Sequence, residues 1–226
     1  MLGIPNWTVL KPHDMRSQGG ATLTLQEDVS ILAGGPTLDL DVYTIVARST
    51  LKHITAIRLE VFPDPSLPHN GPGRNPRNGN FHLNEFRVLI GDAPQSLSAV
   101  AVSYAEYPGY LKTIDGHDGG RFWGVGGRIG QRHIAVFAAE LSPDAKQLLK
   151  FELVSMGKHH LGRFRISVSD DPAAFENEPR EFATMQMTDP WTKLAAAYRF
   201  TGDQQAIDDL VERRPKNAGQ IGDLFI

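Results

Sequence analysis

Two aspartates in a glycine-containing stretch are the first residues whose types and spacing could do chemistry. Asp115 and Asp118 stand in the run Ile114-Asp115-Gly116-His117-Asp118. Hard cations take carboxylate and carbonyl oxygens from loops, so this pair could contribute to a Ca²⁺ site. The spacing departs from the Asp-rich pattern of a calcium-binding loop, and an Asx-turn is the simpler interpretation. The sequence therefore predicts no cofactor, with Ca²⁺ kept as the alternative.

The chain also has eight histidines and no cysteine. The absence of cysteine excludes disulfides, thiolate catalysis and Cys-ligated zinc. No two histidines have the i,i+2 or i,i+4 spacing that would place two ligands on one face of a strand or helix. His159 and His160 are adjacent, so on a strand their side chains would point to opposite faces. No metal site is therefore predicted.

Three further side chains have the chemistry of a binding loop. Arg74 follows Gly73 and could make a bidentate contact to a carboxylate or to sugar hydroxyls. The alternative is that Arg74 holds its own proline-rich loop, through Glu85 or a backbone carbonyl, and the stiffness of that loop favours this reading. Trp123 could stack on a sugar or lie in the core, and its strand-like position favours the core. Asn80 is expected to form a turn or to bond buried backbone groups.

Composition and motifs argue against several classes of function. The 226 residues include 23 Lys and Arg against 26 Asp and Glu, and a formal net charge of −3 gives no general attraction to nucleic acid. No uncharged apolar run approaches the roughly 18 residues of a membrane span. There is no G-x-S-x-G motif, and the stretch 124–130 lacks the Gly-Lys-Ser/Thr ending of a phosphate loop. Glu60 and Glu85 are expected to face outward from their strands. The sequence therefore predicts that the protein is not an enzyme.

The elements that must position these residues are mostly short strands. Apolar and polar residues alternate in Ile57-Arg58-Leu59-Glu60-Val61, as in a half-buried strand. Glycine- and proline-containing turns separate the segments, and no helix-length pattern lies between them. This predicts a mainly β fold, an antiparallel sandwich or jelly roll. The expected strands are Ala21–Leu25, Val42–Ala47, Ile54–Phe62, Phe81–Ile90, Ser98–Glu106, His133–Ala138, Leu148–Ser155 and Arg163–Ser169.

The pattern changes after about residue 170. A polar stretch reads as a linker, and Asp189-Pro190 then has the form of an N-cap followed by proline at the first helical position. A second helix is expected to be capped by Asp203 and to end before Pro215. The spacing of Trp191, Leu194, Ala195, Tyr198 and Gly202 resembles the first helix of a tetratricopeptide repeat. The hairpin is either part of an incomplete array or a cap that packs on the sandwich.

The sandwich region resembles a known family. Gly71-Pro72-Gly73-Arg74 followed by Gly79-Asn80-Phe81, the loop that contains Asp115 and precedes Trp123, and the closing segment 159–168 look like the galactose-binding-like (discoidin-type) β-sandwich of large bacterial multidomain proteins. The resemblance spans roughly residues 7–169. It implies a jelly roll and a binding module, commonly for glycans, although a fold does not establish a ligand.

These observations predict three segments: a galactose-binding-like sandwich over 1–170, a linker over 171–188, and a tetratricopeptide-like helical segment over 189–226. The predicted function is a non-catalytic module that binds carbohydrate or a glycoconjugate through loops at one end of the sandwich. The alternative is a structural or protein–protein interaction module of a larger protein. The residues assigned to the ligand site are Arg74, Asn80, Asp115, Asp118 and Trp123.

Overall fold

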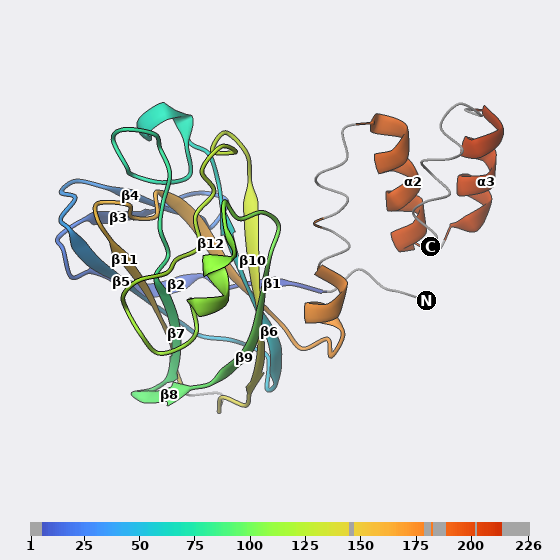
Figure 1. The fold of residues 1–226 in the computed structure, drawn as a ribbon. Coiled ribbons are helices and arrows are strands. Elements are labelled where there is room, and N and C mark those ends of the chain that lie inside the picture. Colours follow the sequence, from blue (N-terminus) through green and yellow to red (C-terminus); the bar gives the residue numbers. More distant parts are fainter. Residues whose placement is uncertain (1–5, 145–146, 179–181, 183–188, 202, 214–226) are drawn as a thin grey trace.

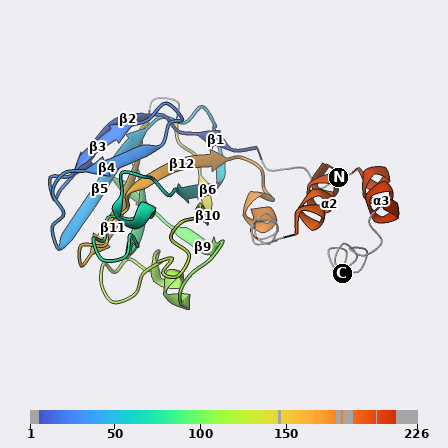
Figure 2. The same cartoon turned by 90° about the horizontal axis from the view of Figure 1, so that it is seen from above.

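Two antiparallel sheets form most of the structure, a computed structural model that describes residues 6–144, 147–178, 182, 189–201 and 203–213 (Figure 1). The first, sheet A, has the order β3 (Thr22–Leu25), β4 (Ile31–Gly34), β12 (Arg163–Ser169), β6 (Ile54–Val61), β10 (His133–Leu141) and β9 (Leu97–Val102), and β1 (Thr8–Val9) also pairs with β12. The second, sheet B, has the order β2 (Pro12–Ser17), β5 (Leu40–Ala47), β11 (Leu149–Met156), β7 (Glu85–Ile90) and β8 (Ala93–Gln95). Side chains of both sheets meet in one buried core. Figure 2 gives a second view of the strands and of the helices that follow them. The predicted mainly β, antiparallel sandwich is confirmed.

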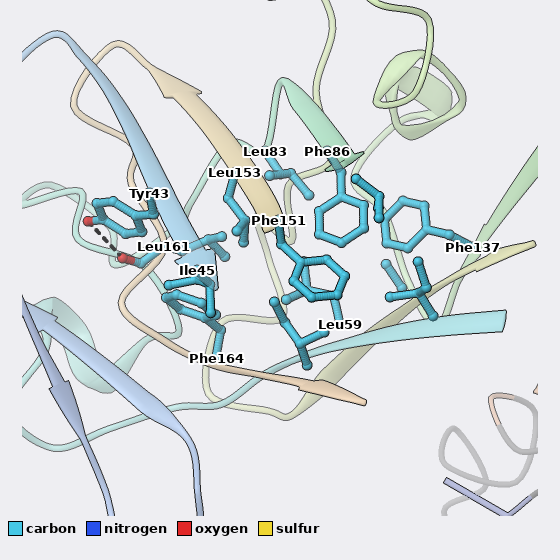
Figure 3. Packing of buried hydrophobic residues seen from close by; sticks show 14 of the residues in the cluster. Tyr43, Ile45, Leu59, Leu83, Phe86, Phe137, Phe151, Leu153, Leu161 and Phe164 are labelled. Carbon is cyan, nitrogen blue, oxygen red and sulfur yellow. Dashed lines mark hydrogen bonds between the residues drawn. The ribbon is translucent and has the colours of Figure 1, made fainter. Parts of the chain in front are cut away.

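The core lies between the two sheets because each strand turns alternate side chains inward. On β6, Ile57, Leu59 and Val61 are fully buried in this core. Aromatic rings join the layers: Phe86 of β7 stacks on Phe137 of β10, with ring centroids 4.3 Å apart (Figure 3). Burying a side chain of this size stabilises the fold by roughly 1.5–3 kcal/mol. These rings therefore fix the spacing of the two sheets.

The outer face of sheet A is covered as well. Ala56, Ile134 and Val136 point away from the central core and form a second buried cluster with Ala174 and Phe182. Residues 174–178 are helical. The segment 171–178 thus packs on the sheet. The sequence predicts it as part of a linker, and a free linker would not pack in this way. The division of the chain at residues 170 and 188 stays a prediction.

A buried charge cluster accompanies this covering segment. Glu60 faces outward from β6, as expected, yet it has no exposed surface. Its carboxylate accepts hydrogen bonds from Arg165 at 2.8 and 3.2 Å and from Arg132 at 2.5 Å. Arg58 lies 3.9 Å from Glu60 and donates a hydrogen bond of 3.2 Å to Glu178, which is itself buried. Strand alternation thus identifies the face of the sheet on which Glu60 lies, but not what covers that face.

The two longest connections lie at one end of the sandwich, where they join β6 to β7 (62–84) and β9 to β10 (103–132). Two shorter connections lie at the same end and join β4 to β5 (35–39) and β11 to β12 (157–162). The two longest connections contain short 3₁₀ helices, η1 (Pro68–Asn70) and η2 (Pro108–Lys112). Because neighbouring strands are antiparallel, these four connections lie at the same end of the strands in both sheets. We call this region the loop end.

Two helices follow the sandwich, α2 (Pro190–Thr201) and α3 (Gln204–Arg213). Asp189 caps α2 as predicted, since its carboxylate accepts a 2.7 Å hydrogen bond from the Thr192 N–H. Asp203 caps α3 in the same way through the Ala206 N–H at 3.0 Å. The helices pack through Ala195, Ile207 and Leu210, and their likeness to a tetratricopeptide repeat stays a prediction. None of the helices that the structure describes has the length and apolar character needed to cross a membrane.

Candidate functional site

The Gly-Pro-Gly-Arg and Gly-Asn-Phe motifs lie side by side at the loop end. The Gly73 N–H donates to the Gly79 carbonyl at 2.9 Å, and a Cβ at Gly73 would collide with the backbone of Asn80. The Arg74 N–H donates to the His160 carbonyl at 2.8 Å. Glycine is therefore required where the two halves of the long loop approach each other.

Arg74 spans this region as a clamp. Its guanidinium donates to the hydroxyl of Tyr43 at 3.0 Å and to the carbonyls of Gly35 and Pro36 at 2.6 and 3.0 Å. Only 7% of the residue is exposed. Burial raises the pKa of Tyr43 to about 12, despite the opposing charge of Arg74, so the hydroxyl stays neutral. Arg74 thus holds the 35–39 loop to the 62–84 loop, which is the alternative that its proline-rich context favoured.

Asn80 and Trp123 also serve the loop framework. The Asn80 side chain accepts a hydrogen bond from the Val125 N–H at 2.9 Å and donates one to Glu106 at 3.2 Å. Trp123 is 1% exposed and packs edge-on against Phe81, with centroids 5.0 Å apart. Neither side chain presents a free face to solvent.

Asp115 and Asp118 lie beside β7. The Asp115 carboxylate accepts from the His117 N–H at 3.1 Å, which is the expected Asx-turn, and Asp118 pairs with Arg87. Burial raises the pKa of the neighbouring Glu85 carboxyl, although a 3.0 Å hydrogen bond from the Gly116 N–H opposes the rise. Glu85 faces outward from β7, opposite to the core residues Phe86 and Val88, and is buried because the 113–118 loop folds over it. Across the part of the chain that the structure describes, no three His, Asp or Glu side chains gather as metal ligands would, and the Ca²⁺ alternative stays a prediction.

The five predicted site residues therefore belong to different parts of the loop end. Arg74 contacts the 35–39 loop, and Asn80 contacts the 103–132 loop. Trp123 makes a hydrogen bond within the 103–132 loop, and the two aspartates lie over β7. Their assignment to one ligand site stays a prediction.

A row of aromatic and imidazole rings crosses the outer side of the loop end. The sequence did not predict it. Phe81 and Leu83 enter the core, so alternation turns His82 outward between them. The His82 ring stacks on Phe122 on one side, at 3.5 Å, and on His159 on the other, at 3.7 Å. Tyr107 meets the far side of Phe122 edge-on at 4.9 Å. We call these four half-buried residues, Tyr107, Phe122, His82 and His159, the ring ladder.

The ring ladder is uncharged at its centre. Burial is the main cause that lowers the pKa of His82, to about 3. His159 has both ring nitrogens in hydrogen bonds: Nδ1 lies 2.7 Å from the Gly157 carbonyl, and Nε2 lies 2.7 Å from the Asn75 amide nitrogen. A carbonyl only accepts, so Nδ1 carries the hydrogen and Nε2 accepts from Asn75. The stack can therefore act as a neutral aromatic surface.

A cavity of about 540 Å³ opens at the His159 end of the ring ladder. It lies between the 75–78 segment and the turn at 157–159. Its polar lining residues are Asn75, Arg77, Asn78, Lys158 and His159. Ligand pockets of this size combine ring surfaces with a few polar groups that orient the ligand.

The sequence contained one signal for this site. His159 and His160 were expected on opposite faces, and His160 is indeed buried, with Nε2 2.6 Å from the Leu38 carbonyl, while His159 ends the ring ladder. The stacking partners could not be identified, because His82, Phe122 and His159 come from three separate connections.

No protein-family model matches the sequence, and no curated protein matches it. One solved structure is similar, that of the CBM32-1, CBM32-2 and M60 catalytic domains of Clostridium perfringens ZmpB, with 11% sequence identity and a TM-score of 0.36. The match covers 96% of this chain and 19% of that one, so this chain spans less than a fifth of its length. The β-sandwich architecture rests on the two sheets described above.

Proposed function

We propose that this chain is a non-catalytic binding module that recognises carbohydrate at the loop end of a galactose-binding-like jelly roll. The ring ladder is the observation that carries the proposal. Its neutral, half-buried rings lie beside a cavity lined by amide and cationic side chains. Sugars present both an apolar C–H face, which suits a ring, and hydroxyl groups, which suit amides and cations.

The buried residues of the predicted site have a supporting role in this proposal. Arg74 ties two of the loops together, and Asn80 and Trp123 fix the segment that supplies Phe122. Asp115 and Asp118 reach solvent and remain candidates for contacts to an extended ligand. The ring ladder and the cavity would hold the ligand itself.

A glycan array followed by isothermal titration calorimetry tests the proposal. The matched variants are Phe122→Ala, which interrupts the ring ladder, and Val9→Ala, which shortens an exposed apolar side chain on sheet A. We expect saccharide binding to the parent chain and to Val9→Ala, and a clear loss for folded Phe122→Ala. Absence of binding to every neutral and acidic saccharide would remove the carbohydrate assignment.

The second candidate is a protein-interaction module. A cavity of about 410 Å³ lies between α2 and α3, with Leu194 and Ala206 among its lining residues. Apolar surface of this kind is typical of contacts with another protein. If no saccharide binds and Leu194→Glu alters self-association in sedimentation experiments without unfolding the chain, the helices rather than the loop end would be the functional surface.

A further inference from the structure

The cavity beside His159 has a one-sided charge distribution. Arg77 and Lys158 contribute a guanidinium and an ammonium group to its lining, and no lining residue is acidic. Both residues are exposed. The cavity is therefore electropositive although the whole chain has a net charge of −3.

These two cations differ from several arginines in or beside the sheets, which have acidic partners. Arg165 and Arg132 bond to Glu60, Arg87 pairs with Asp118, and Arg163 pairs with Asp28 and Asp64. Among the residues that the structure describes, neither the Arg77 guanidinium nor the Lys158 ammonium group has a carboxylate within salt-bridge distance. Their charges are available for a ligand.

Lys158 also stands in a backbone conformation that disfavours it. Residues 156–159 form a tight turn closed by a 3.3 Å hydrogen bond from the His159 N–H to the Met156 carbonyl. Both central residues have positive φ, 67° at Gly157 and 62° at Lys158. Such turns prefer Gly or Asn, and another residue in the left-handed region is strained. Lys158 therefore occupies a position that glycine would fill with less strain.

The other polar groups of the cavity have fixed roles. The His159 ring is held in place by its contacts to Gly157 and Asn75, and the Asn75 oxygen accepts from the Arg77 N–H at 2.9 Å. Asn78 uses its oxygen to accept from the Asn80 N–H at 3.1 Å, which leaves its amide N–H groups to donate. Arg77 and Lys158 are thus the groups in this cavity that would attract an anionic ligand, and the His159 ring lies beside them.

We propose that this cavity binds an acidic sugar, a saccharide whose carboxylate or sulfate ester is held by Arg77 and Lys158 while its ring lies against His159. This inference rests on the proposed function and names the class of carbohydrate. Hydrogen bonds between a cation and a carboxylate or sulfate are about twice as strong as neutral ones, so they decide between acidic and neutral sugars.

Calorimetry with four probes tests the inference: lactose, 3′-sialyllactose, galactose-6-sulfate and inorganic sulfate. The variants are Arg77→Gln and Lys158→Gly, with Lys52→Gln as the control, because Lys52 is an exposed cation in the connection at the opposite end of the sandwich. We expect at least one acidic sugar to bind ten-fold or more tightly than lactose. Each cavity variant should lower that affinity about ten-fold and lower the affinity for lactose by a smaller factor, because lactose has no anionic group for the two cations to hold. Lys158→Gly should unfold at the same temperature as the parent chain or higher, because it relieves the turn.

The outcomes separate the two proposals. Equal affinity for lactose and the acidic sugars, unchanged in Arg77→Gln and Lys158→Gly, would overturn the acidic-sugar inference and leave a carbohydrate-binding module. Binding of inorganic sulfate without binding of any saccharide would overturn both proposals. An acidic preference that persists in both cavity variants but disappears in Lys52→Gln would also overturn the inference, since it would place the anion elsewhere.

Discussion

The imidazole rings of His82 and His159 stack with centroids 3.7 Å apart and planes only 4° from parallel. Two cationic rings in this arrangement would repel each other, and burial already disfavours a proton on His82. The stack joins the 62–84 loop to the 157–162 loop, whose backbones also bond through the His82 N–H and the His159 carbonyl at 2.7 Å. The same contact thus supports the fold and forms the centre of the candidate site.

The first prediction concerns acid stability. The pKa of His82 falls from 6.5 to about 3 in the folded chain, so the unfolded chain binds this proton first as the pH drops. The folded state should therefore lose stability progressively from about pH 6.5 towards pH 3, and this contribution should be absent in His82→Phe. Urea unfolding of both chains between pH 4 and pH 8 measures the difference. Parallel curves for the two chains would show that His82 titrates normally.

The second prediction concerns the aromatic surface. Phe122→Ala removes the ring that stacks on His82 and meets Tyr107. Loss of one ring contact should weaken saccharide binding about five- to ten-fold, which corresponds to roughly 1–1.4 kcal/mol. Calorimetry on the folded variant measures the change. An affinity equal to that of the parent chain would show that the ring ladder is only a packing feature.

The third prediction concerns the buried carboxylate of sheet A. Burial alone would raise the pKa of Glu60, but the hydrogen bond from Arg165 and the charges of Arg58 and Arg132 outweigh it and lower the pKa. Glu60→Gln leaves these arginines without their central carboxylate and should cost about 3–5 kcal/mol of unfolding free energy. Glu140→Gln, at an exposed position, should cost little.

The pH dependence of this cluster provides an independent check. A lowered pKa means that Glu60 contributes stability above its unfolded value of about 4.5 and loses it as the pH falls through the folded value. Chemical unfolding at pH 7 and pH 3 should show a large difference between the parent chain and Glu60→Gln at pH 7 and a smaller one at pH 3. The reverse order would contradict the charge cluster as described.

The fourth prediction separates two neighbouring arginines. Arg74→Lys cannot reproduce the hydrogen bonds to Tyr43, Gly35 and Pro36, because an ammonium group lacks the planar fork of guanidinium. It should destabilise the chain by about 1–3 kcal/mol. Arg77→Lys, at an exposed position in the same loop, should leave stability within about 0.5 kcal/mol of the parent chain. Thermal unfolding of the two variants compares them, and equal losses would rule out the clamp.

Most strands could be predicted where alternation and β-branched residues coincide. Arg163–Ser169 has the observed bounds, and Ile54–Phe62 is one residue too long. Strand β2, Pro12-His-Asp-Met-Arg-Ser17, was not predicted, because its polar residues form a strand only by pairing with β5. Such pairing is a tertiary effect that overrides local preference.

Less of the candidate site could be predicted. The sequence identified Arg74, Asn80 and Trp123 by residue type, but type does not show whether a side chain faces solvent or a neighbouring loop. The cavity brings together Asn75 and His159, which are 84 positions apart in the chain. No local pattern shows that contact, because it depends on how the loops pack against one another.

A map of where a saccharide binds is the most direct test of binding at the ring ladder and the cavity beside His159. Two-dimensional NMR spectra of the chain, titrated with the tightest-binding sugar from the array, would follow the aromatic and imidazole signals of the ring ladder together with backbone amides. We expect shifts concentrated at His82, Phe122, Lys158 and His159, with the signals of α3 unchanged. Shifts confined to the helices or to the opposite end of the sandwich, or none at saturating sugar, would contradict binding at the ring ladder and the cavity.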